Sequence, residues 1–271
     1  MVQHLWLIPV GFFVGTWGTL IGAGGGFVLM PLLLLLYPDE RPEMITAISL
    51  AVVFFNALSG SIAYGRMRRI DYKSGFLFSA ATLPGAILGA LTTAYIPRRL
   101  FDAIFGLLLI GASVFLLLHP NRKNETKGSN LNGLLTRNVV EASGARHTYS
   151  YNPILGVGLS LIVGYVSSLL GIGGGIIHVP ALVHLLNFPV HIATATSHFI
   201  LAAMSLAGTT VHLATGVFSH GVRRTISLAM GVLLGAQLGA RLSVRVHGNW
   251  IIRGLAIALG FVGIRILLMA A

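Results

Sequence analysis

A glycine run inside a long apolar segment occurs twice in this chain, and it restricts the possible folds more than any other feature. The first copy is GAGGG at 22–26 with Pro31 five residues beyond it, and the second is GIGGG at 171–175 with Pro180 at the same spacing. Each glycine costs a helix interior about 1 kcal/mol and each proline about 3 kcal/mol. Both segments are therefore expected to be broken helices.

The composition predicts an all-α integral membrane protein. Of the 271 residues, 55% are hydrophobic and 9% are charged, whereas soluble domains carry about 25% charged residues. Several apolar runs reach the roughly 18 residues of a spanning helix, and they lack the alternation of a barrel strand. The net charge of +11 comes mostly from loops between apolar segments. This is typical of topology signals, so we expect no nucleic-acid partner.

The chain divides into two transmembrane repeats, residues 1–118 and 153–271, which are joined by a polar, basic linker at 119–152. Each repeat contains four helices, giving about eight transmembrane segments, and the first helix of each is broken or hairpin-like at its glycine run. The linker holds few apolar residues, and we expect it to form a short surface helix at most.

The repeat is visible position by position. Eight residues of the first half match residues 149 positions later, and they include the glycines of the run, the proline and flanking Gly15, Leu20 and Leu33. Ser49 and Gly60 match Ser197 and Gly208 at an offset of 148, whereas Gly85 and Gly89 match Gly231 and Gly235 at 146. Such drift is what small loop insertions produce, so we interpret the halves as a duplication.

The broken segments leave two topologies open. As one helix, residues 5–37 would be about 50 Å long, against a hydrocarbon core of about 30 Å. If each segment bends and crosses the membrane, the repeats are parallel and Arg223 and Arg224 are cytoplasmic. If each returns to its own side, the repeats are inverted and Arg241, Arg245 and Arg253 are cytoplasmic instead. The basic cluster at 66–73 and the linker are expected inside in either case.

The glycine runs are the main candidates for a substrate site. Exposed backbone is tolerated in a membrane only where it is buried in protein or lines a wet cavity, and matched broken helices indicate a transport site. Free amides at a half-helix N-terminus offer partial positive charge to an anion. Close helix packing through small residues is the alternative explanation. The candidate residues are Gly24, Gly25, Gly26, Gly173, Gly174 and Gly175.

Polar side chains within the later spans complete the candidate set. Ser49 and Asn56 are seven residues apart on one helix face, and His198, Ser205 and His212 repeat that spacing. Serine and threonine often bond to their own helix, and an arginine near a boundary often snorkels, so each has a structural alternative. The side chains expected to bind substrate are Ser49, Asn56, His178, Thr196, Ser197, His198, Gln237 and Arg241.

The acidic residues favour an anionic substrate. All seven fall in loops or at span ends, so neither a cation path nor a proton relay built on carboxylates is expected. The chain has no cysteine, which excludes thiolate metal sites and cysteine nucleophiles. We find no enzyme constellation and expect no catalytic residue, metal or cofactor.

The doubled glycine motif, the segment Ala195-Thr196-Ser197 and the pattern Gly235-Ala236 to Gly239-Ala240 resemble the sulfite exporter TauE/SafE family. The resemblance covers nearly the whole chain outside the linker. It implies a multi-pass permease of the bacterial cytoplasmic membrane that exports sulfite or an organosulfur anion such as sulfoacetate. The expected partners are this anion, the lipid bilayer and, as one option, a second copy in a homodimer. Transport of another small anion or a metal ion, or a non-transporting assembly role, are the alternatives.

Overall fold

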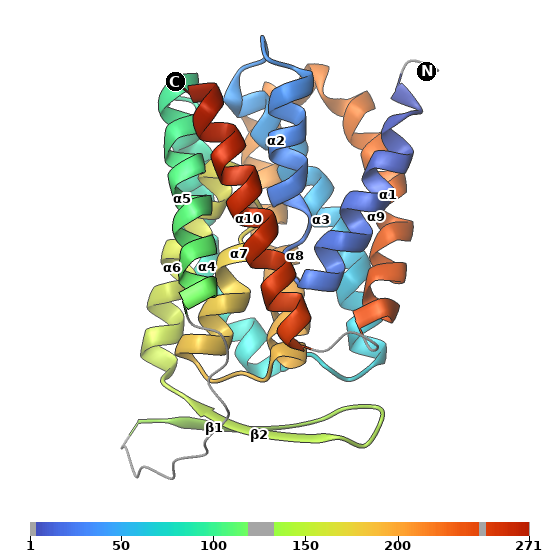
Figure 1. The fold of residues 1–271 in the computed structure, drawn as a ribbon, viewed down its shortest axis with the longest axis vertical. Helices are drawn as coiled ribbons and strands as arrows, with labels where there is room; N and C mark the ends of the chain where they lie inside the picture. The colour runs from blue at the N-terminus through green and yellow to red at the C-terminus, as the bar shows by residue number, and fades with distance from the viewer. Residues whose placement is uncertain (1–3, 119–132, 244–247, 271) are drawn as a thin grey trace.

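The computed structural model describes residues 4–118, 133–243 and 248–270. Helices pack side by side along one axis, and a two-stranded β-hairpin lies across one end of the bundle (Figure 1). We call this the hairpin end, and we call the opposite end, where both chain termini lie, the terminal end (Figure 1). The helices before the hairpin are α1 Leu7–Ile21, α2 Gly26–Leu36, α3 Pro42–Arg66, α4 Tyr72–Thr93 and α5 Arg98–Leu118.

The helices after the hairpin follow a similar order. They are α6 Pro153–Leu170, α7 Gly175–Pro180, the π-helix η2 Ala181–Leu185, α8 Val190–Ala214, the short 3₁₀ helix η3 Val217–His220, α9 Val222–Ser243 and α10 Gly248–Ala270. The strands between the two sets are β1 Leu135–Val140 and β2 Arg146–Tyr151.

Each glycine-broken segment turns back inside the bundle. Helix α1 runs inward from the terminal end and α2 returns to that end, while α6 runs inward from the hairpin end and α7 with η2 returns there (Figure 1). With 15 residues, α1 is about 22 Å long, shorter than a hydrocarbon core. The arrangement therefore corresponds to the hairpin alternative of the sequence analysis.

Within the described residues, five helices are long and apolar enough to span a membrane: α3, α4, α6, α8 and α9. Helices α1 and α2 and the segment Gly175–Leu185 are shorter apolar helices, because the glycine runs divide the long segments in which they lie. The chain is thus a helical membrane protein. Large apolar side chains such as Phe13, Phe76 and Phe261 project from the outside of the bundle, where lipid would contact them.

Glycines set the closest helix contacts. A Cβ on Gly85 would lie 2.2 Å from the carbonyl oxygen of Leu161 on α6, and one on Gly235 would lie 2.2 Å from that of Phe12 on α1. Gly89 and Gly239 contact the next turns in the same way.

These contacts correct one detail of the sequence comparison. Leu161 and Phe12 are 149 residues apart, so the equivalent of Gly85 on α9 is Gly235, at an offset of 150. The sequence match of Gly85 to Gly231 at 146 is one helical turn out of register. Glycine recurs every four residues at 231, 235 and 239, so a shift of four leaves most of the pattern matched.

The linker prediction is wrong for residues 135–151. They form an antiparallel hairpin in which Leu135 pairs with Tyr151 and Val140 with Arg146, and not a short surface helix. Side chains alternate along both strands, so that Tyr149 and Tyr151 are buried while Thr148 is exposed. The remaining linker residues 119–132 lie outside the described part of the chain.

Candidate functional site

The two glycine loops have the same backbone conformation. Gly22, Gly24 and Gly25 have φ angles of 86°, 73° and 78°, and the residues 149 positions later have 67°, 78° and 74°. Residues with a side chain rarely adopt these angles. In each loop the first of these glycines ends one helix and the third begins the next.

The loops contact each other in the interior of the bundle. A Cβ on Gly26 would lie 2.5 Å from the carbonyl oxygen of Ile172, and a Cβ on Gly175 would lie 2.4 Å from that of Gly22. No side chain fits at either position. We call this meeting point of residues 22–26 and 171–175 the loop crossing.

Two serines bind the loops from neighbouring helices. Ser49 on α3 donates its hydroxyl to the carbonyl oxygen of Gly171 over 2.6 Å, and Ser197 on α8 donates to that of Gly22 over 3.3 Å. These carbonyls lie at the C-terminal ends of α6 and α1, where backbone oxygens lack helical partners. Each serine thereby covers a site of negative partial charge. The structure places both predicted serines at the loop crossing, with their hydrogens directed to the backbone.

The amide ends of the loops differ from the carbonyl ends. The first helical hydrogen bonds of α2 and α7 are donated by Val28 to Gly25 and by Ile177 to Gly174. The amides of the preceding residues, Gly26 and Gly175 among them, belong to the donors that a helix N-terminus leaves without an intrahelical acceptor. The N-terminal ends of two broken helices therefore meet at the loop crossing.

A buried polar network joins α1, α3 and α8 beside the first loop. The hydroxyl of Thr19 donates to Oδ1 of Asn56 over 3.1 Å. Because a hydroxyl has one proton to donate, Nε2 of His198 must be the donor in its 3.2 Å contact with the same oxygen. Tyr64 donates to the carbonyl oxygen of Thr19 over 2.8 Å, and its ring contacts His198 edge-on. The structure thus brings the predicted residues Asn56 and His198 together. The atoms Asn56 Nδ2 and His198 Nδ1 have no partner among the described residues.

Two other predicted residues lie away from this network. His178 is buried in α7 and contacts the hydroxyl of Ser160 on α6 at 3.2 Å. Thr196 accepts a hydrogen bond from the backbone amide of Asp71 at the hairpin end, over 3.1 Å.

The two predicted residues of α9 also have other environments. Gln237 donates its amide to the backbone and hydroxyl oxygens of Ser59 at 2.8 and 2.9 Å, which ties α9 to α3. Arg241 is exposed on the outside of the bundle.

The hydroxyl residues just before the glycine runs were not among the predicted site residues. Thr19 is at the centre of the polar network. Ser168 lies 149 residues later in the sequence, and Ser167 directly precedes it. Both serines are fully buried, and neither hydroxyl has a partner among the described residues. Their position three or four residues before the first glycine of each run was the available signal.

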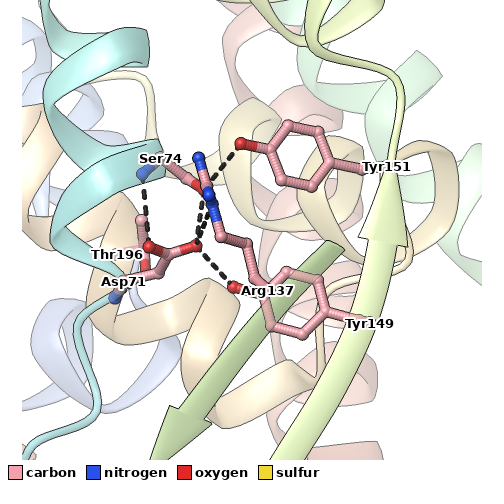
Figure 2. A network of polar contacts seen from close by, with 6 residues as sticks. All are labelled: Asp71, Ser74, Arg137, Tyr149, Tyr151 and Thr196. Atoms are coloured by element: carbon pink, nitrogen blue, oxygen red, sulfur yellow. Dashed lines mark hydrogen bonds and ion pairs between the residues drawn. The ribbon is translucent and has the colours of Figure 1, made fainter. Parts of the chain in front are cut away.

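The hairpin is fastened to the bundle through Asp71 (Figure 2). The carboxylate caps α4 by accepting hydrogen bonds from the backbone amide and the hydroxyl of Ser74. It also accepts a hydrogen bond of 2.8 Å from the hydroxyl of Tyr149. Arg137 lies 3.8 Å from the same carboxylate, and Tyr151 contacts Ser74 at 2.7 Å. Burial, together with the adjacent Asp71 carboxylate, raises the pKa of Tyr149.

A second ion pair fastens the turn of the hairpin. Arg69 and Glu141 are both buried and lie 2.9 Å apart, and His147 contacts the other carboxylate oxygen at 2.9 Å. Burial alone would raise the pKa of Glu141, but Arg69 and His147 outweigh it and hold that pKa below its usual value. The hairpin is therefore anchored to α4 and to the connection before it.

Comparison with known proteins gives one consistent result. The model of the family described as sulfite exporter TauE/SafE matches residues 7–266. The probable membrane transporter protein YunE of Bacillus subtilis is 32% identical over 96% of both chains. The probable membrane transporter protein MJ0441 of Methanocaldococcus jannaschii is 25% identical over 97% of this chain and 94% of its own. No solved structure matches.

The paired broken helices, the buried polar network and these similarities agree on a protein that moves a solute and not on an enzyme. The chain belongs to the sulfite exporter TauE/SafE family of membrane transporters.

Proposed function

We propose that this transporter exports a small sulfur oxyanion or organosulfur anion, such as sulfite or sulfoacetate, and binds it at the loop crossing. The meeting of two half-helix N-termini in the bundle interior supports this most, because their amides favour negative charge. Ser49 and Ser197 cover the opposing carbonyl ends. Among the described residues, the acidic side chains lie at the two ends of the bundle: Asp39, Glu40, Glu43, Asp71, Asp102 and Glu141.

The same proposal includes two inverted repeats of four helical units, residues 1–118 and 153–271, that arose by duplication. Reciprocal contacts support this. Gly26 of the first loop contacts Ile172 of the second, and Gly175 of the second loop contacts Gly22 and Ala23 of the first. In the same way, Gly22 contacts Thr194 on α8 and Gly171 contacts Thr46 on α3. Alternating access would then be a rocking of one repeat against the other around the crossing.

We further propose that the hairpin end faces the cytoplasm. Described basic residues at that end are Arg66, Arg68, Arg69, Lys73, Arg137, Arg146, Arg241 and Arg253, against Asp71 and Glu141. Described basic residues at the terminal end are Arg41, Arg98, Arg99, Arg223, Arg224 and Arg265, and described acidic residues there are Asp39, Glu40, Glu43 and Asp102. The excess of lysine and arginine near the hairpin is typical of the cytoplasmic side, and we place the protein in the cytoplasmic membrane.

Flux of sulfite and sulfoacetate in proteoliposomes tests the proposed site. We expect Gly174→Leu to abolish flux, because the residue has a φ of 74° and its Cβ would lie 2.8 Å from Ser167 Oγ. Gly158→Leu is the matched control, since Gly158 lies on α6 and no atom of the described residues comes within 4 Å of its Cβ position. Full flux in Gly174→Leu would refute the site.

Because Gly174→Leu can impair folding, Asn56→Leu gives a second measurement. It removes the unpartnered amide at similar side-chain volume, and we expect flux at low substrate to fall about 10-fold, the equivalent of one hydrogen bond to a charged group. Gel filtration of both variants tests whether each protein remains folded, and only variants with an unaltered elution profile enter the comparison. Unchanged flux in Asn56→Leu would remove Asn56 from the substrate site.

A further inference from the structure

The loop crossing has two sides that are built alike. Gly60 on α3 packs against His198 and Thr19, with its Cβ position 2.5 Å from His198 Cδ2 and 3.1 Å from Thr19 Cγ2. Gly208 on α8 packs in the same way against Leu50 and Ser168, at 2.8 Å from Leu50 Cδ1 and 2.6 Å from Ser168 Oγ.

These pairs fall at the offsets of the repeat, 148 on α3 and α8 and 149 on α1 and α6. Thr19 corresponds to Ser168, Tyr64 to His212 and Asn56 to Met204.

The two sides differ in how their polar atoms are bonded. On the first side, the hydroxyls are bonded: that of Thr19 contacts both Asn56 and His198, and that of Tyr64 bonds to the backbone. The atoms left there without a partner among the described residues are Asn56 Nδ2 and His198 Nδ1. On the second side, Leu50 takes the position equivalent to His198 and Met204 the position equivalent to Asn56. Neither apolar side chain can bond to the hydroxyl of Ser168. The hydroxyl of Ser168 and Nε2 of His212 accordingly have no partner among the described residues.

A third unpartnered group belongs to Ser167, the residue before Ser168 on α6. Ser167 is fully buried, its hydroxyl has no partner among the described residues, and it lies 2.8 Å from the Cβ position of Gly174 in the second loop. His212 is one helical turn beyond Gly208 on the same face of α8 and is 1% exposed. The three side chains thus extend from the second glycine loop along the α6–α8 contact. We call them the α6–α8 donor cluster.

The chemistry of the cluster identifies what it can bind. Two hydroxyls and an imidazole can each donate a hydrogen bond, and none carries a carboxylate or an obligatory positive charge. Buried polar groups without a partner are rare in folded proteins, and each one calls for an explanation. An anion with several acceptor oxygens can accept hydrogen bonds from donors of this kind.

We propose that the transporter binds its substrate asymmetrically, with the oxygens of the anion held by Ser167, Ser168 and His212 on the α6–α8 side of the loop crossing. The equivalent residues Thr19 and Tyr64 serve structure instead, because their hydrogen bonds are made within the protein. This inference rests on the proposed anion transport and adds three residues to that same site, besides Asn56, that contribute to affinity.

The test compares concentration-dependent sulfoacetate and sulfite flux in proteoliposomes for Ser168→Ala, His212→Phe and the double variant. We expect each single variant to raise the half-saturating concentration about 10-fold and the double variant to raise it more, because each removes a donor to a charged group. Thr210→Val is the matched control, since Thr210 is exposed and bonds only to its own helix in the described structure.

Thermal unfolding separates binding from structure. Without substrate, the melting temperature of Ser168→Ala should remain or rise, because the lost hydroxyl has no bond to any described residue, whereas Thr19→Val should lower it. Flux with unchanged half-saturation in the double variant would overturn this inference alone. If the unaltered protein carries neither anion, the proposed function fails, and the inference that rests on it fails too.

Discussion

At the scale of single residues, the loop crossing depends on glycines for two separate reasons. Gly24 and Gly173 need a backbone angle that other residues avoid, with φ of 73° and 78°. Gly26 and Gly175 have ordinary angles but lie against the opposite loop, so they need the absence of a side chain. A substitution at the second pair therefore tests packing between the loops without changing the backbone angle.

We predict that Gly26→Ala and Gly175→Ala each destabilise the protein by about 1–3 kcal/mol, the usual cost of overpacking. The added methyl would lie within 2.5 Å of a backbone oxygen that cannot move independently. Gly111→Ala on α5 is the control, because in the described part of the chain no atom lies within 4 Å of that Cβ position and alanine favours a helix. Thermal unfolding in detergent provides the measurement, and equal melting temperatures for all three variants would contradict the contact.

Residue types and spacing located part of the candidate site. The glycine runs, Ser49, Ser197, Asn56 and His198 were named from the sequence, and the structure places them together. Thr196 and Gln237 were named by the same reasoning, but helical spacing does not specify which helix a polar face meets. Thr196 meets Asp71 and Gln237 meets Ser59, and neither contact has a local sequence signal.

At the scale of elements, the β-hairpin is the feature that sequence reasoning missed. Its strands alternate inward and outward side chains, and Gly144 in the turn between them has a φ of 88°. The alternation was readable, but six-residue strands are marginal alone and need a surface to cover. That surface includes Asp71, Ser74 and Arg69, which are distant in sequence.

We predict that acid weakens the attachment of the hairpin through Glu141. Its folded-state pKa is lowered, so its contribution to stability is complete above the ordinary value of 4.5 and is lost as pH falls through the folded-state pKa. The melting temperature of the unaltered protein should therefore fall as the pH is lowered below the ordinary value of 4.5.

Glu141→Gln provides the comparison for this acid effect. It should melt at a lower temperature than the unaltered protein at pH 7, because Arg69 loses its charged partner. On acidification, the melting temperature of Glu141→Gln should fall less than that of the unaltered protein. Parallel curves for the two proteins would assign the acid sensitivity to other groups.

At the scale of the whole molecule, the proposed orientation can be measured directly, because the natural chain has no cysteine. We predict that Tyr95→Cys is labelled by an impermeant maleimide in intact cells, since Tyr95 is 85% exposed at the terminal end. Thr148→Cys, on the exposed face of the hairpin, should be labelled only after the membrane is permeabilised. The reverse pattern would place the hairpin outside.

The reciprocal contacts at the loop crossing also have a consequence for biosynthesis. Ser49 holds a carbonyl of residue 171, and Ser197 holds a carbonyl of residue 22. Helix α1 likewise packs against α9, whose Gly231 and Gly235 belong to the last third of the chain. The first glycine loop therefore remains without its final partners until most of the polypeptide has left the ribosome. Neither half completes its own interior, so the two halves reach their final structure together, late and as one unit.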